Sequence, residues 1–145
     1  MKLISHRGNT IGPVISEENK PKYIVEAIQK GFDVEIDVWL KNQTLYLGHD
    51  EPQYCISDSF LKEHDNFLWC HAKNHLALNF LIENNFHCFW HQEDLYTVTS
   101  KGYIWCYPNS ELTGARSICL FPDVTNQNYE KAFGVCSDWI EKYKF

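Results

Sequence analysis

The sequence predicts an α/β fold built around a parallel sheet that is either open or closed into a barrel. Short apolar runs with the length of strands recur along the 145 residues, and helical patterns lie between several of them. Five late runs each contain or adjoin one cysteine, at intervals of 18, 18, 13 and 17 residues: Cys70, Cys88, Cys106, Cys119 and Cys136. A complete barrel of eight strands and eight helices usually needs about 200 residues or more. A barrel of this size must therefore have several outer helices missing or reduced to loops, within a single domain spanning residues 1–145.

Nine runs are expected to form strands, because they are short, apolar and bounded by polar or turn residues. They cover residues 2–5, 33–40, 45–48, 67–71, 87–90, 95–99, 103–107, 118–121 and 135–137. The polar stretch 41–44 is short enough to join its two neighbours in a hairpin. Residues 95–99 and 103–107 are too close for a parallel crossover, so either one of them is not a barrel strand or the two pair antiparallel.

Five segments are expected to form helices. The first, 20–30, has Pro21 in its first turn and is followed by Gly31, two positions that these residue types favour. The second, 57–64, opens with Ser57, a good cap residue. The others cover residues 76–84, 128–133 and 138–144.

Composition and charge narrow the functional classes. With 44% hydrophobic and 15% aromatic residues the chain can build a core, which argues against intrinsic disorder. A net charge of −6 disfavours a nucleic-acid partner or an anionic membrane, although a cation or an arginine can still bind a small anionic substrate in one cleft. No run is long enough for a membrane span and no apolar signal segment follows Met1, so a cytoplasmic location is expected. The six cysteines are expected to be reduced and buried, with a disulfide framework as the alternative.

The expected strand 33–40 places acidic side chains on one face. With a period of two residues, Asp33, Glu35 and Asp37 share that face with Trp39. Carboxylates buried together repel one another unless a positive charge lies among them, and hard oxygen ligands suit Mg²⁺ or Ca²⁺. The pattern indicates a cation site, with an edge strand whose acidic face is solvated as the alternative.

Two histidines are expected at strand ends near these carboxylates. His6 and Arg7 directly follow the first apolar run, and His49 follows the run 45–48 in the same way. Residues at the carboxyl ends of strands face the site in α/β sheets, and Gly8 permits a sharp turn there. The planar donors of Arg7 suit a phosphate. A cation, a base and an acid are the parts that phosphodiester cleavage requires.

The ordered set of motifs resembles the glycerophosphodiester phosphodiesterase family. The motifs are His6-Arg7-Gly8, Glu18-Asn19, Glu35-Ile36-Asp37 and His49-Asp50, in that order and at similar spacing, and they cover about the first third of the chain. The resemblance implies a reduced or incomplete TIM-like (β/α) barrel. It also implies a metal-dependent hydrolase of lipid metabolism that cleaves a small phosphodiester such as a glycerophosphodiester.

The same resemblance implies roles for individual residues. His6 and His49 act as general acid and base, in an order that the sequence does not assign. Glu35 and Asp37 bind a divalent ion, which is Mg²⁺, Ca²⁺ or Mn²⁺. Arg7 contacts the phosphate, and Asn19, a polar residue near the site, is expected to help bind the substrate or its phosphate. In the family, the glycerol hydroxyl of the substrate can serve as the nucleophile.

The third strand departs from the family pattern of Glu-x-Lys. Lys73 matches the lysine near the phosphate, but His71 replaces the acid. Strand parity places both side chains on one face, so His71 is expected as a third metal ligand, although imidazole suits softer ions better than Mg²⁺ or Ca²⁺. Near the carboxyl end, Asp138 follows an apolar run, as an aspartate does after the last strand of the family.

Two other functions stay open. A relative that binds phosphate or metal with little turnover would explain His71 and the short barrel. A phospholipase-type phosphodiesterase would require an apolar rim around the site, and the sequence shows no clear amphipathic membrane-binding helix. A second copy of the chain could cover the barrel wall that missing helices expose, so a homodimer is a further expectation. Structural or solvated positions are expected for His64, His75 and His87. A site role is disfavoured for His91.

Overall fold

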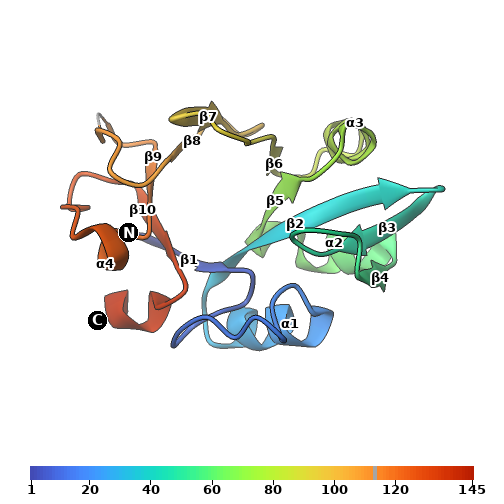
Figure 1. The fold of residues 1–145 in the computed structure, drawn as a ribbon, viewed down its shortest axis with the longest axis horizontal. Coiled ribbons are helices and arrows are strands. Elements are labelled where there is room, and N and C mark those ends of the chain that lie inside the picture. The colour runs from blue at the N-terminus through green and yellow to red at the C-terminus, as the bar shows by residue number, and fades with distance from the viewer. Residues whose placement is uncertain (113) are drawn as a thin grey trace.

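The computed structural model describes residues 1–112 and 114–145 and shows a mixed α/β fold with one curled sheet (Figure 1). Ten strands form this sheet within the described residues. Their bounds are β1 Lys2–His6, β2 Asp33–Lys41, β3 Thr44–Leu47, β4 Tyr54–Ile56, β5 Leu68–Ala72, β6 Cys88–Phe89, β7 Tyr96–Val98, β8 Ile104–Cys106, β9 Ser117–Leu120 and β10 Gly134–Ser137.

Parallel pairing runs through most of the sheet. The neighbours β6, β5, β2, β1, β10, β9 and β8 pair in parallel, in this order. Two antiparallel parts extend the sheet. In one, β3 pairs antiparallel with both β2 and β4, and in the other, β7 pairs antiparallel with β8. A backbone hydrogen bond of 2.8 Å from Ser100 N to Cys88 O links the turn after β7 to β6. The sheet therefore curls into a partial barrel, and the carboxyl ends of its parallel strands face the same way.

Short helices connect the strands within the described part of the chain. Their bounds are α1 Pro21–Gln29, α2 Asp58–His64, α3 His75–Glu83 and α4 Pro122–Thr125, with the 3₁₀ helices η1 Asp65–Phe67 and η2 Ile140–Tyr143. Pro21 occupies the first turn of α1, Ser57 caps α2, and Asn74 caps α3 by accepting a hydrogen bond from a backbone amide. These three helices lie on the β1–β6 side of the molecule (Figure 1).

The strand β2 separates an apolar face from a polar one. Val34, Ile36 and Val38 are fully buried in a cluster that includes Leu61 of α2 and Leu81 of α3. The alternate residues of β2 point to the opposite face, inside the curled sheet. A second buried cluster fills part of that interior: Ile4, Trp69, Phe89, Trp105, Ile118, Leu120 and Cys136. The period of two therefore places the carboxylates of β2 inside the partial barrel.

The predicted parallel α/β sheet is confirmed, and the antiparallel alternative for residues 95–107 is confirmed by β7 and β8. The helix predicted at 128–133 is wrong. Glu130 N donates a hydrogen bond to the side chain of Asn128 at 2.9 Å, and Phe133 N donates to Ser117 O at 2.9 Å, outside any helical turn. A segment this short gains too little from helical hydrogen bonds to resist these competing partners.

Several smaller elements also differ from expectation. The helix predicted at 138–144 is only the four-residue η2, and neither β4 nor α4 was predicted, because three or four residues carry too little periodicity. All six cysteines are free, as expected, but Cys55 is exposed. Among the residues described, no helix has the length and apolar character that a bilayer crossing requires. The homodimer stays a prediction.

Candidate active site

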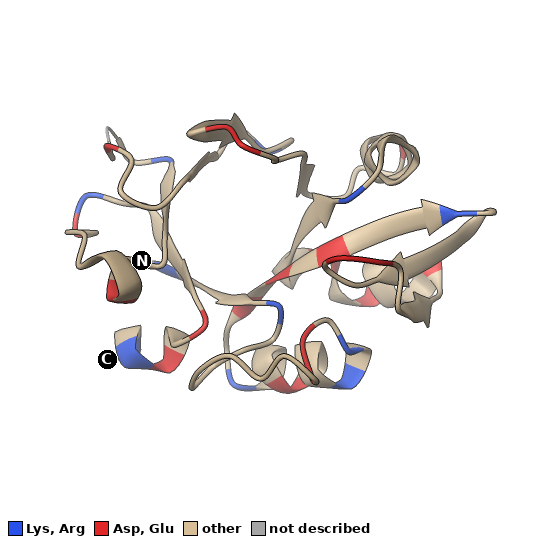
Figure 2. Ribbon diagram, in the orientation of Figure 1, with Lys and Arg blue, Asp and Glu red and all other residues tan. Residues whose placement is uncertain are grey.

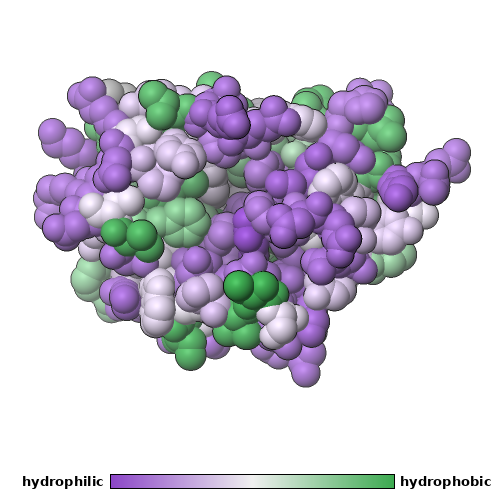
Figure 3. Space-filling view, in the orientation of Figure 1, coloured by the Kyte–Doolittle hydropathy of each residue, from purple (hydrophilic) through white to green (hydrophobic). Residues whose placement is uncertain are grey.

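Polar side chains gather inside the sheet at the carboxyl ends of four neighbouring strands. The strands β5, β2, β1 and β10 lie side by side and each contributes a residue, on the strand or directly after it. Acidic segments mark β2 in Figure 2, and Figure 3 shows hydrophilic residues gathered near the middle of the same face. The contributors are His6 of β1, Glu35 and Asp37 of β2, His71 of β5 and Asp138 after β10.

Glu35 and Asp37 of β2 are almost completely enclosed, with 2% of Glu35 and 0% of Asp37 exposed. Asp37 Oδ2 accepts a hydrogen bond from Asn19 Nδ2 at 2.8 Å and lies 3.1 Å from Arg7 Nε. Asp37 Oδ1 and Glu35 Oε2 have no hydrogen-bond partner. Burial opposes ionisation of Asp37, but contacts with nearby histidines and Arg7 hold its pKa well below the usual range. The alternative of a solvated acidic edge strand is wrong, because β2 is paired on both sides.

His71 lies opposite Asp37 on β5 and turns one ring nitrogen toward both carboxylates. Its Nδ1 is 3.3 Å from Asp37 Oδ1 and 3.7 Å from Glu35 Oε1. Its Nε2 contacts the carbonyl oxygen of His91 at 2.9 Å, and the ring stacks on Phe89. Burial opposes protonation of His71, but the nearby carboxylates of Asp37 and Glu35 outweigh it and raise the pKa of His71 to about 9. The charged ring offsets part of the negative charge around it.

Glu35, Asp37 and His71 could together hold a divalent cation. One ligand atom from each residue lies within 4.8 Å of the others. Atoms bound to one ion at about 2.0–2.5 Å stand roughly 3–5 Å apart, so these side chains fit an ion without large movement. The two buried oxygens without partners are a second sign of fit, because a buried unpaired carboxylate oxygen is costly unless a cation or donor meets it.

His6 and Asp138 form a hydrogen-bonded pair across the neighbouring strands β1 and β10. Burial opposes ionisation of Asp138, but the contacts with His6 and Asn9 outweigh it and lower its pKa, so the carboxylate accepts a hydrogen bond of 2.7 Å from His6 Nδ1. The lone pair of His6 is therefore on Nε2, 3.8 Å from Glu35 Oε2. The buried amide of Asn9 donates to Asp138 at 2.8 Å and to Glu18 at 2.9 Å, which holds the pair in place.

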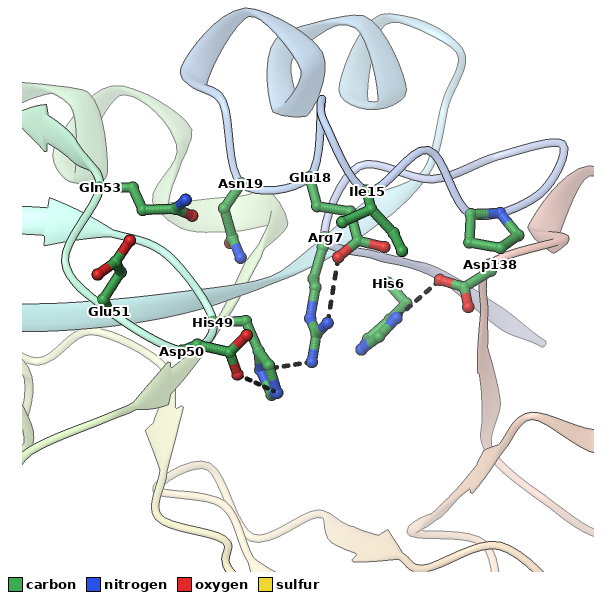
Figure 4. A pocket seen from close by; sticks show the side chains of 11 residues that line it. His6, Arg7, Ile15, Glu18, Asn19, His49, Asp50, Glu51, Gln53 and Asp138 are labelled. Carbon is green, nitrogen blue, oxygen red and sulfur yellow. Dashed lines mark hydrogen bonds and ion pairs between the residues drawn. The ribbon is translucent and has the colours of Figure 1, made fainter.

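Arg7 lies between the two histidines (Figure 4). Its guanidinium donates hydrogen bonds to Glu18 Oε2 at 3.1 Å and to His49 Nδ1. A guanidinium cannot accept, so this contact places the lone pair of His49 on Nδ1 and its ring proton on Nε2, 3.6 Å from Asp50 Oδ1. The side chain of His49 is 41% exposed, whereas that of His6 is 15% exposed. The enclosed His6 thus presents a lone pair to the site, and the more exposed His49 presents an N–H.

The backbone at Arg7 fixes the direction of the guanidinium. Arg7 has a φ of +56°, in the left-handed region that costs free energy for a residue with a side chain. Two backbone hydrogen bonds hold it there, from Arg7 N to Glu35 O at 2.9 Å and from Asn19 N to Arg7 O at 3.0 Å. Gly8 follows with a φ of +93°, where a Cβ atom would lie 2.6 Å from the ring of Tyr23. Only glycine fits this turn.

Two pockets share His6, Arg7 and His49 as their common wall. The first has a volume of about 350 Å³ and is lined by four carboxylates: Glu18, Asp50, Glu51 and Asp138. The second has a volume of about 380 Å³, with the polar centre on one side and an aromatic and apolar wall on the other: Trp105, Tyr107, Pro108, Leu120 and Phe121. The polar centre therefore has an acidic side and an aromatic side.

The structure brings together the eight site residues that the sequence predicted: His6, Arg7, Asn19, Glu35, Asp37, His49, His71 and Lys73. Lys73 is the farthest from a partner, with its Nζ atom 4.0 Å from Asp37 Oδ1. Asp33 shares the face of the carboxylates but lies outside the site, because it pairs with Lys2 at 3.1 Å and accepts a hydrogen bond from Trp69.

Other contributors were missed by sequence reasoning. The pairing of Asp138 with His6 had one signal, the position of Asp138 directly after the last expected strand. Tyr107 and Phe121 had the same signal, since they follow β8 and β9 directly. The contacts of Asn9 had none beyond its place beside the His-Arg-Gly motif.

No protein-family model, curated protein or solved structure matches the chain. A functional assignment therefore depends on the geometry described above.

Proposed function

We propose that the protein is a divalent-cation-dependent phosphodiesterase that hydrolyses a small phosphodiester, as the glycerophosphodiester phosphodiesterases that its motifs resemble do. The observation that carries this proposal is the enclosure of two carboxylates with unpartnered oxygens, Glu35 and Asp37, among His71, Arg7, His6 and His49. On this proposal the partial barrel is a reduced TIM-like barrel, in which short connections replace several outer helices.

The charges around the centre suit a phosphate together with a cation. Two permanent cations, Arg7 and Lys73, face four carboxylates, so negative charges exceed positive ones by two before His71 is counted. The four carboxylates belong to Glu18, Glu35, Asp37 and Asp138. A dication held by Glu35, Asp37 and His71 would offset this excess and neutralise charge on the phosphate oxygens. Arg7 and Lys73 would then donate hydrogen bonds to the remaining oxygens.

His6 acts as the general base. Asp138 keeps the ring proton on Nδ1 and stabilises the imidazolium that forms when Nε2 takes a proton. The proton comes from the attacking hydroxyl, which belongs to the substrate's own glycerol or to water. A new P–O bond forms in this step, while the ester bond to the leaving alcohol breaks. Attack by the glycerol hydroxyl gives a cyclic phosphodiester, which water then opens in a second step of the same kind to complete the hydrolysis.

His49 protonates the leaving alcohol from Nε2. When Arg7 binds the phosphate through Nη2, it no longer donates to His49 Nδ1. This nitrogen can then be protonated, because Asp37 Oδ2 lies 3.6 Å away and stabilises the imidazolium form. The imidazolium is the form that gives up a proton readily. Because 41% of the His49 side chain is exposed, solvent can restore that proton after each turnover.

The two pockets suit the two ester arms of a phosphodiester whose phosphate lies at Arg7. The acidic pocket favours a polyhydroxylated or cationic alcohol, because carboxylates accept hydrogen bonds and attract positive charge. The aromatic pocket favours an apolar or flat group, which Trp105 and Tyr107 contact.

Hydrolysis of glycerophosphocholine with added Mg²⁺, Ca²⁺ or Mn²⁺ tests the proposal. Turnover is expected to require the cation and to stop on chelation. His6→Ala is expected to lower kcat by about 10²–10⁴-fold with an unchanged circular dichroism spectrum, while the exposed His75→Ala is expected to leave kcat unchanged. Phosphate or cation binding without turnover would contradict the proposal and identify the weakly catalytic relative. Unchanged turnover after removal of both His6 and His49 would contradict their roles.

A phospholipase-type phosphodiesterase is a second candidate, favoured by one observation. The loop after β1 exposes three apolar side chains, with 64% of Ile11, 42% of Val14 and 83% of Ile15 exposed, and Ile15 borders the acidic pocket. An apolar rim of this kind suits a substrate embedded in a lipid aggregate. The double substitution of Ile11 and Val14 by Ser is then expected to lower turnover of micellar phosphodiesters and to spare soluble ones. An equal effect on both would exclude this candidate.

A further inference from the structure

One ligand of the proposed cation site is a nitrogen atom, where the family that the motifs resemble has an oxygen. We infer that His71 makes this site select a first-row transition-metal dication, such as Mn²⁺, Co²⁺ or Zn²⁺, over Mg²⁺ and Ca²⁺. This selectivity rests on the cation site of the proposed function and names the class of ion that binds there.

The ring of His71 is fixed so that Nδ1 is the atom that faces an ion, which would displace the proton from this nitrogen on binding. A carbonyl oxygen only accepts hydrogen bonds, so the 2.9 Å contact with His91 O requires a proton on Nε2. Histidines that bind metals usually donate their other ring N–H to a carbonyl or carboxylate in this way, which fixes the tautomer. Phe89 stacks against the ring with 14° between the two planes and holds it in place. The remaining nitrogen faces Asp37 and Glu35.

Each carboxylate places one oxygen near His71 Nδ1. Asn19 and Arg7 contact Asp37 Oδ2, which orients the carboxylate and leaves Oδ1 without a hydrogen-bond partner. Lys73 is 4.0 Å from Oδ1, too far for a hydrogen bond. Glu35 Oε1 lies 3.7 Å from His71 Nδ1, whereas the unpartnered Glu35 Oε2 lies 3.8 Å from His6 Nε2, and both carboxylate side chains are more than nine-tenths buried. One ligand atom each from Glu35, Asp37 and His71 lies within 4.8 Å of the others, close enough to share one ion.

Two carboxylate oxygens and one imidazole nitrogen discriminate between classes of ions. Mg²⁺ and Ca²⁺ are hard cations that prefer oxygen ligands only. First-row transition dications bind imidazole more strongly, in an order of affinity that rises from Mn²⁺ toward Cu²⁺. A glutamate in place of His71 would give an all-oxygen set with three negative charges, which suits Mg²⁺ or Ca²⁺. The preference of the site therefore depends on this single residue.

Mn²⁺ is the best probe, because its unpaired electrons couple to the nuclei of the atoms that bind it. It also prefers oxygen-rich sites, so it binds the free cysteines of the chain poorly. Pulsed electron paramagnetic resonance of the full chain loaded with Mn²⁺ is expected to show coupling to an imidazole nitrogen. Titration is expected to give an affinity for Mn²⁺ about tenfold or more above those for Mg²⁺ and Ca²⁺. His71→Glu is expected to lose the nitrogen coupling and to lower the ratio of Mn²⁺ to Ca²⁺ affinity several-fold.

Two control variants make the assignment to His71 specific. His75→Glu makes the same change at an exposed position of α3, and His6→Ala removes another imidazole that lies near Glu35. Both are expected to retain the nitrogen coupling. If the charge added by His71→Glu prevents folding, His71→Gln replaces the nitrogen with an amide oxygen without adding a negative charge. The inference is overturned if the unmodified chain shows no coupling, if coupling persists without His71, or if Mg²⁺ or Ca²⁺ binds as tightly as Mn²⁺.

Binding and turnover are separate readouts. Selective Mn²⁺ binding through His71 in a chain that hydrolyses no phosphodiester supports the selectivity and contradicts the proposed function. Hydrolysis that Mg²⁺ sustains, in a chain whose Mn²⁺ shows no nitrogen coupling, supports the proposed function and overturns the selectivity.

Discussion

Residues 1–90 and residues 91–145 build the two sides of the curled sheet in different ways. The first part contributes β1 to β6 and the helices α1, α2 and α3, whereas the second contributes β7 to β10 with the four-residue α4 and η2 (Figure 1). The apolar cluster that packs strands against helices belongs entirely to the first part. The first side is thus a strand-and-helix layer, and the second is a sheet joined largely by turns.

The chemistry of the site follows the same division. The three residues proposed to bind the cation, Glu35, Asp37 and His71, all belong to residues 1–90, and of the charged residues around them only Asp138 belongs to the second part. The aromatic wall of the second pocket belongs to residues 91–145. Helix-backed strands hold charged groups in fixed positions, while the turns after β8 and β9 shape a pocket. We therefore expect substitutions in the first part to change the rate of turnover and those in the second to change substrate affinity, except at Asp138.

The largest loss is expected from Asp37→Asn, in the first part. The amide removes the charge that faces the cation and Arg7, so turnover is expected to fall by about 10³-fold. Cation affinity is expected to fall with it. Steady-state kinetics and Mn²⁺ titration measure both effects, and Asp58→Asn, at an exposed position of α2, is the matched control. Turnover within a few-fold of the unmodified chain would refute the role of Asp37.

Asp138→Ala tests the exception to this division, because Asp138 belongs to the second part but positions His6, the proposed base in the first part. Without this carboxylate His6 loses its partner for the imidazolium form, so kcat is expected to fall by about 10²-fold with little change in KM. The double variant with His6→Ala is expected to lose no more than His6→Ala alone, since both changes remove one function. Losses that multiply would show that Asp138 acts independently of His6.

His87 lies where the two parts of the chain contact each other. Its Nε2 contacts Thr99 Oγ1 at 2.7 Å, and its ring lies 4.2 Å from that of Trp69. Burial, with a smaller effect of Lys101, lowers the pKa of His87 from 6.5 to about 4. Between these values the unfolded chain binds a proton that the folded chain does not, so the free energy of unfolding should decrease as the pH falls, by up to about 3 kcal/mol.

Urea unfolding at several pH values between about 7 and about 4 measures this decrease. His87→Gln keeps a polar group beside Thr99 but cannot take up the proton. The variant should therefore lose this part of the pH dependence. An identical dependence in both proteins would rule out His87 as its source.

The smallest effect is expected from Tyr107→Ala, in the wall of the aromatic pocket. KM is expected to rise several-fold for phosphodiesters with an apolar or aromatic arm, while kcat stays within about twofold, because Tyr107 contacts no reacting atom. Tyr96→Ala is a matched control, since Tyr96 is 45% exposed and Tyr107 47% exposed, but only Tyr107 lines the pocket. A lower kcat at constant KM would mean that the second part does more than bind substrate.

The strand β2 shows why much of the fold and the site could be predicted from the sequence. Its apolar residues alternate with carboxylates, and this period of two determines which side chains face the helices and which face the interior. His6 and His49 were predictable for a similar reason, because they directly follow apolar runs. Local patterns of this kind depend on covalent geometry alone.

Contacts between distant segments could not be predicted in the same way. Asp138 lies 132 positions from His6, so no periodicity links the two residues. The proton positions on His49 and His71 depend on Arg7 and on a carbonyl oxygen of another loop. The wrong helix at 128–133 has the same cause, because the amide of Phe133 finds its partner on β9. Such details depend on tertiary contacts.

A crystal soaked with Mn²⁺ and tungstate, a mimic of phosphate, tests most directly whether one centre holds both a cation and a phosphate. Anomalous scattering is expected to place Mn²⁺ at about 2.0–2.3 Å from atoms of Glu35, Asp37 and His71, with the oxyanion at Arg7 between His6 and His49. An Mn²⁺ position away from β2, or an oxyanion that contacts neither histidine, would contradict the account.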